Sequence, residues 1–77
     1  MFSIELDVSY ESTHQEIVEF ALEHNCNATL VTENGPGGGN PVYEFASNNI
    51  KSVMELTTDI YGETFDTETL KTMIVEA

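Results

Sequence analysis

The chain has 77 residues, and its composition already excludes several classes of protein. It carries 14 Asp and Glu residues against 2 Lys and Arg residues, which gives a formal net charge of −12. So few cations exclude a protein that holds nucleic acid or anionic lipid through a positive patch, and a single cysteine excludes a disulfide scaffold. The hydrophobic share of 40% is enough for one small core, so we expect a single domain over residues 1–77.

The N-terminal segment predicts a strand. Residues 2–10 alternate between apolar and polar side chains, which is typical of a strand with one buried face. Its apolar members are Phe2, Ile4, Leu6, Val8 and Tyr10.

A helix over residues 13–24 follows. Thr13 with Glu16, or Ser12 with Gln15, forms the pattern of a capping box at its start. Asn25 suits the left-handed conformation that ends many helices. The expected apolar stripe consists of Ile17, Val18, Ala21 and Leu22.

Residues 28–33 are rich in β-branched side chains and predict a second strand, and residues 42–46 predict a third. Between them, residues 34–41 are dominated by Gly and Pro, which continue neither a strand nor a helix. We therefore expect a hairpin with a long connection. A flexible link is the favoured interpretation of this loop, and a loop that orders on a partner is the alternative, in which Asn34, Gly37, Gly38 and Asn40 are the candidate contact residues.

The third strand leads into a second helix. Ser47, Asn48 or Asn49 caps its start, and Gly62 suits its end. The side chains with helical spacing are Ile50, Val53, Met54, Thr57, Ile60 and Tyr61.

The C-terminal segment carries two competing signals. Leu70, Met73, Ile74 and Ala77 have helical spacing, and Asp66 suits the N-cap position. A strand over residues 70–75 is the alternative, because an apolar run lies at its end. We expect a helix.

These elements give the order β-α-β-β-α-α and predict an α+β fold. A right-handed crossover between the first two strands, with the third strand returning between them, gives a ferredoxin-like split βαβ arrangement. The expected sheet is three-stranded, antiparallel or mixed, in the order 1-3-2. We expect the helices on one face and a C-terminal helix in place of the fourth strand.

The predicted elements separate the acidic residues into two sets. Because the apolar residues of the first strand face the helices, Glu5 and Asp7 point to the opposite face, where Glu44 joins them. A second set forms an exposed stripe on the first helix. The six candidate partner-binding residues are Glu5, Asp7, Glu16, Glu19, Glu23 and Glu44.

The sequence contains no recognisable catalytic or metal-binding motif. His14, His24 and Cys26 are the only soft or borderline metal ligands, and their spacing matches no zinc site. A buried Cys26 is more typical of a small hydrophobe than of a nucleophile. We therefore expect a protein that is not an enzyme and that uses no cofactor and no metal.

A short, strongly acidic α+β chain with almost no Lys or Arg resembles the small bacteriophage proteins that disarm host machinery, a class that includes anti-CRISPR proteins and DNA mimics. Residues 34–41 with the Val-Tyr-Glu-Phe that follows are also similar to a hairpin of small phage proteins. The resemblance implies an inhibitor in the host cytoplasm that occludes a basic, nucleic-acid-binding surface of a host protein or nucleoprotein complex, such as a CRISPR effector. From the near absence of Lys and Arg we expect no direct binding of nucleic acid and no membrane association.

The alternative function is a structural or regulatory module. Such a module pairs with a partner or with itself through the open sheet face or through the edge of the first strand. Val31, Val42 and Ala46 would then form an apolar patch on that face. The expected state in solution is a monomer or a homodimer.

Overall fold

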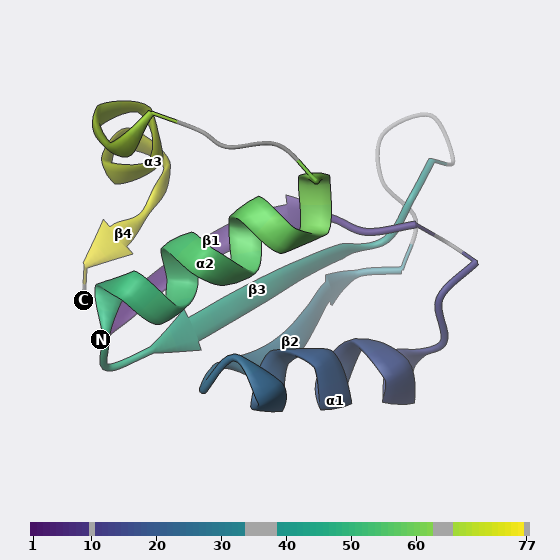
Figure 1. Ribbon diagram of the computed structural model, residues 1–77. Coiled ribbons are helices and arrows are strands. Elements are labelled where there is room, and N and C mark those ends of the chain that lie inside the picture. The colour runs from purple at the N-terminus through teal and green to yellow at the C-terminus, as the bar shows by residue number, and fades with distance from the viewer. Residues whose placement is uncertain (10, 34–38, 63–65, 77) are drawn as a thin grey trace.

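The computed structural model describes residues 1–9, 11–33, 39–62 and 66–76 (Figure 1). Within these residues the chain forms four strands and three helices, which confirms the α+β class. In chain order they are β1 (Phe2–Asp7), α1 (His14–Glu23), β2 (Asn27–Thr32), β3 (Val42–Ser47), α2 (Ile50–Tyr61), α3 (Thr67–Met73) and β4 (Val75–Glu76).

The sheet has the order β2-β3-β1-β4, and every neighbouring pair is antiparallel. The expected placement of the third strand between the first two is confirmed, but the three-stranded sheet of the predicted ferredoxin-like arrangement is wrong. A fourth strand lies at the outer edge of β1, where Phe2 pairs with Glu76 and Ser3 with Val75.

The C-terminal segment forms both of the structures that its sequence suggests. Asp66 caps α3 as expected, but the helix ends at Met73 because Ile74 has an extended backbone (φ −85°, ψ 132°). Ile74 packs against the core, and the next two residues satisfy backbone groups at the edge of β1. The expected helix is therefore shorter than its apolar spacing suggested.

The register between β1 and β3 determines which side chains enter the core. Ile4 lies opposite Phe45, Leu6 lies opposite Tyr43, and all four are at most 3% exposed. The same buried cluster contains residues from both long helices, namely Ile17, Ala21, Val53 and Leu56. Both helices thus cover one face of the sheet, as expected, and the described residues leave the other face without a helix (Figure 1).

The ends of the long helices follow local sequence signals. Thr13, not Ser12, caps α1 and forms the capping box with Glu16. Asn25 follows this helix in a left-handed conformation with a φ of 58°. Asn49 caps α2, and Gly62 ends it with a φ of 67°.

One part of the predicted α1 stripe is wrong. Leu22 is 59% exposed, whereas Ile17 and Ala21 are buried and Phe20 packs against the core. The helix packs mainly on the edge strand β2, so its outer flank faces solvent. The buried stripe is therefore narrower than that of a helix lying over the centre of a sheet.

Candidate functional site

Three of the candidate carboxylates lie together on the helix-free face of the sheet. Glu5 on β1 is directly opposite Glu44 on β3, and Asp7 lies two residues further along β1 on the same face. Side chains directly opposite each other in an antiparallel pair have Cβ atoms about 4.5–5.5 Å apart. Glu5 and Asp7 are exposed, and Glu44 is half-buried. We call these three residues the sheet-face acids.

Asp7 also has a partner from α2. The Tyr61 hydroxyl donates a hydrogen bond to Asp7 Oδ1 over 3.2 Å. Burial, followed by the negative charge of Asp7, raises the pKa of Tyr61, so the phenol remains a donor at neutral pH. Tyr61, the last of the α2 side chains with helical spacing, is 39% exposed, because its position at the end of α2 brings it to Asp7.

The other three candidate carboxylates, Glu16, Glu19 and Glu23, are exposed on α1; we call them the α1 acids. Glu16 has a structural role, because its Oε1 accepts a hydrogen bond of 3.0 Å from the Thr13 backbone N–H. Hydrogen bonds from the backbone and then from the side chain of Thr13 lower the pKa of Glu16. Glu19 accepts a hydrogen bond from Gln15 Nε2 at 3.2 Å.

The two acidic sets do not form one site. The α1 acids lie on a helix that covers one face of the sheet, whereas Glu5 and Glu44 lie on the opposite face, and Asp7 lies at the end of β1, where its carboxylate reaches Tyr61 of α2. A flat cationic surface therefore contacts only one set at a time. The two lysines, Lys51 on α2 and Lys71 on α3, are exposed, and neither forms an ion pair with any carboxylate that the structure describes.

An ion pair that the sequence analysis did not anticipate joins α1 to α2. His24 Nε2 lies 2.6 Å from Asp59 Oδ2, and Nδ1 lies 2.9 Å from the backbone oxygen of Phe20. Both partners are acceptors, so this geometry favours the imidazolium, which donates from both nitrogens. The Phe20 carbonyl, followed by the Asp59 carboxylate, raises the pKa of His24. The sequence offers one signal that His24 faces the interior: it lies four residues after Phe20 and seven after Ile17, which is the spacing of one helix face.

The remaining candidate ligands and nucleophile are engaged within the fold. His14 Nδ1 lies 2.9 Å from the Tyr43 hydroxyl. The Cys26 thiol is buried and 3.4 Å from the His24 carbonyl oxygen, and burial raises the pKa of Cys26, which disfavours the reactive thiolate. Across the described ranges, no group of three or more His, Cys, Asp or Glu side chains could hold a metal ion.

Most of the candidate loop lies outside the described residues, including Asn34, Gly37 and Gly38. Asn40, the fourth candidate, is half-buried just before β3. The neighbouring Pro41 carbonyl accepts a hydrogen bond of 2.9 Å from the Val8 backbone N–H. The start of β3 is thus attached to the end of β1.

In the part of the chain that the structure describes, no helix combines the length and apolar character of a membrane span. Comparisons with protein-family models, with curated proteins and with solved structures find no match.

Proposed function

We propose that this protein is a non-enzymatic inhibitor that docks its sheet-face acids onto a basic, nucleic-acid-binding surface of a host complex. The observation that carries the proposal is the cross-strand pair of Glu5 and Glu44, with Asp7 beside it and both lysines on helices. Like charges directly opposite each other in a sheet are destabilising. Because the Glu5–Glu44 pair lowers the stability of the sheet, its presence supports a role for these charges in binding a partner.

The inhibition is steric and electrostatic. A sheet face is a rigid platform, with strands about 4.8 Å apart and alternate residues on one strand about 7 Å apart. Carboxylates at these spacings present a dense negative array to Lys and Arg residues that otherwise contact phosphates. The carboxylates of this protein and the phosphates of the nucleic acid bind the same Lys and Arg residues of the partner. Docking of the protein therefore excludes the nucleic acid without any chemical step.

The class of partner follows from the charge and from the resemblance to small acidic phage proteins. The favoured partner is a nucleoprotein complex with a basic channel, such as a CRISPR effector, in the cytoplasm of a bacterial host. We also infer that the sheet order and the α1 and α2 crossovers represent a ferredoxin-like fold, with α3 inserted before β4.

The test compares two variants of equal charge. The first replaces the sheet-face acids through Glu5→Gln, Asp7→Asn and Glu44→Gln. The matched control replaces Glu11, Glu55 and Glu68 with Gln; these residues are exposed and belong to neither acidic set. Each variant loses three carboxylates, so the net charge changes from −12 to −9 in both.

Both variants are assayed for inhibition of target-DNA binding by a purified CRISPR effector complex, from about 0.05 to about 0.3 M NaCl. We expect the wild type and the control to inhibit, and inhibition to weaken steeply with salt. The sheet-face variant should require at least about tenfold more protein for the same effect. Equal inhibition by the two variants would exclude docking through the sheet face.

The edge strand β2 supports a second candidate function, pairing with a second copy of the chain. β2 carries no charged residue, and Leu30 and Val31 on it are 37% and 49% exposed. An uncharged edge strand is a template for pairing with another strand. Of the expected patch of Val31, Val42 and Ala46, Val31 is 49% exposed, Val42 is half-buried and Ala46 is buried.

Sedimentation of the wild type and of Thr29→Lys tests this second function. Thr29 lies on β2, opposite Glu44 on β3. A dimer that the lysine disrupts would support pairing through β2. A wild type that remains monomeric at high protein concentration would exclude it.

A further inference from the structure

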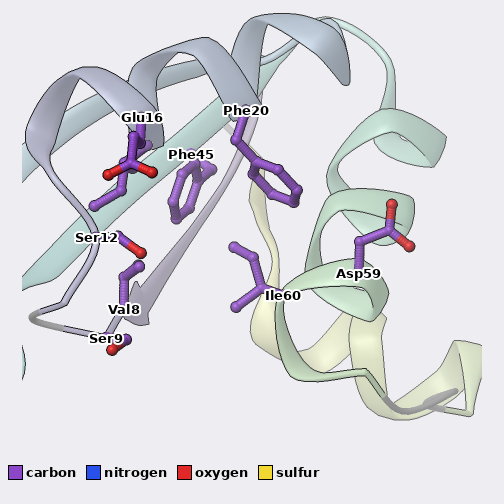
Figure 2. Close-up of a pocket in the computed structure, with 9 residues that line it drawn as sticks. Val8, Ser9, Ser12, Glu16, Phe20, Phe45, Asp59 and Ile60 are labelled. Carbon is purple, nitrogen blue, oxygen red and sulfur yellow. The ribbon is translucent and has the colours of Figure 1, made fainter.

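A hollow of about 390 Å³ lies between α1 and α2, beside the end of β1 (Figure 2). Phe20 of α1 and Ile60 of α2 point toward each other across it, and Phe45 of β3 closes its base (Figure 2). Val8, just after β1, adds a further apolar side chain. Phe45 is fully buried, while Phe20, Ile60 and Val8 are half-buried.

The hollow follows from the way the two helices lie on the sheet. α1 packs mainly on β2, whereas α2 packs on β3 and β1, and the helices make few contacts with each other. The His24–Asp59 pair joins the helices. The volume is at the lower end of the range for ligand sites, about 300–1,000 Å³, so it suits one large side chain better than an extended ligand.

The rim of the hollow is acidic. Glu16 and Asp59 line it together with Ser9 and Ser12, and no Lys or Arg does. The Asp59 side chain is 58% exposed, so it remains accessible to a partner while it binds His24. An apolar base below two carboxylates, on a chain of net charge −12, favours an apolar group flanked by cations over a neutral or anionic ligand.

We propose that this hollow is a docking groove for a linear basic peptide segment of a partner protein. The segment inserts one aromatic side chain between Phe20 and Ile60, and its flanking Arg or Lys side chains face Glu16 and Asp59. Aromatic side chains bury a large area at a low cost in conformational entropy, and they often dominate binding as central anchors. The groove lies on the helix side of the sheet, so it is a site separate from the sheet-face acids.

Short peptides test the groove independently of any host complex. The probe is acetyl-Arg-Trp-Arg-amide, and the comparison peptides are acetyl-Arg-Gly-Arg-amide and acetyl-Glu-Trp-Glu-amide. Binding is followed through the amide NMR shifts of Val8, Phe20 and Ile60 at an ionic strength of about 0.15 M, where exposed charges are largely screened beyond about 8 Å. We expect saturable shifts with the first peptide and at least about tenfold weaker binding of the other two.

Substitutions that fill the groove complete the test. Ser12→Trp places an indole in the groove and should weaken binding of acetyl-Arg-Trp-Arg-amide at least about tenfold. Ser9→Trp, on the same rim, serves if Ser12→Trp fails to fold. Thr72→Trp is the matched control, because Thr72 is exposed on α3 and should leave binding unchanged.

Two results would overturn the proposal. One is equal binding of the glycine and tryptophan peptides, since the aromatic anchor would then contribute nothing. The other is unchanged binding by a folded groove-filling variant. Neither result depends on inhibition of a host complex, so failure of the groove and failure of the sheet-face function are separate outcomes.

Discussion

The repulsion between Glu5 and Glu44 leads to a direct prediction for stability. Glu44→Lys replaces a cross-strand pair of like charges with a pair of opposite charges. Cross-strand pairs contribute roughly 0.2–1 kcal/mol, so removing a repulsion and adding an attraction should stabilise the fold by about 1 kcal/mol. For a domain of this size that corresponds to a rise of about 4–8 °C in Tm.

A matched substitution separates this pair from the general reduction in charge. Glu55→Lys changes the net charge from −12 to −10, as Glu44→Lys does. Glu55, however, is exposed on the helix α2 and therefore has no cross-strand neighbour. Melting by circular dichroism near neutral pH gives the Tm of each variant. We expect Glu44→Lys to melt about 4–8 °C above Glu55→Lys in low salt.

Salt provides the second part of the assay. At about 1 M ionic strength the Debye length falls to about 3 Å, so both repulsion and attraction across the pair should weaken. The wild type should gain stability in salt, and the difference between the two lysine variants should shrink. Equal Tm values in low salt, or a difference that persists in high salt, would refute the idea that Glu5 and Glu44 repel each other in the folded protein.

Three further predictions concern the core, the helix end and the histidine. Leu56→Ala, at a fully buried position, should reduce the free energy of unfolding by about 2–5 kcal/mol in urea titrations. Gly62→Ala should reduce the free energy of unfolding by about 1 kcal/mol through backbone strain at a φ of 67°. An added Cβ meets no atom within 4 Å, so no steric clash contributes, and Gly62→Asn should be milder because Asn adopts this left-handed conformation more readily. His24 has a raised pKa in the folded state, so its contribution to stability should be full below its ordinary pKa of 6.5 and disappear as the pH rises through the folded value. Urea unfolding of the wild type and His24→Gln across that range checks this, and a stability difference that is independent of pH would contradict it.

Much of the fold could be predicted because its signals are local. The alternation in β1, the capping box at Thr13 and the stop at Gly62 depend on residues a few positions apart. The end of the chain could not be predicted in the same way. The helical spacing through Ile74 competes with pairing between β4 and the start of β1, about 70 positions away, and pairing at that distance leaves no mark in the local sequence.

The candidate site shows the same division between local and distant information. The period of two in β1 placed Glu5 and Asp7 on one face, and the register with β3 then placed Glu44 beside them. The link between His24 and Asp59 joins residues 35 positions apart. The groove depends on the distance between two helices, which the apolar spacing within each helix does not determine.

The environments of individual carboxylates indicate where a function in binding should be sought first. Glu16 completes a helix cap, Asp59 holds His24, and Asp7 accepts a hydrogen bond from Tyr61. Glu5 and Glu44 form no side-chain hydrogen bond within the described part of the chain, yet they lie directly opposite each other. We expect their charges to weaken the sheet, whereas replacing Glu16, Asp59 or Asp7 removes a hydrogen bond within the fold as well as a surface charge. A loss of binding in Glu5→Gln or Glu44→Gln, accompanied by a gain in stability, therefore separates a functional charge from a structural one.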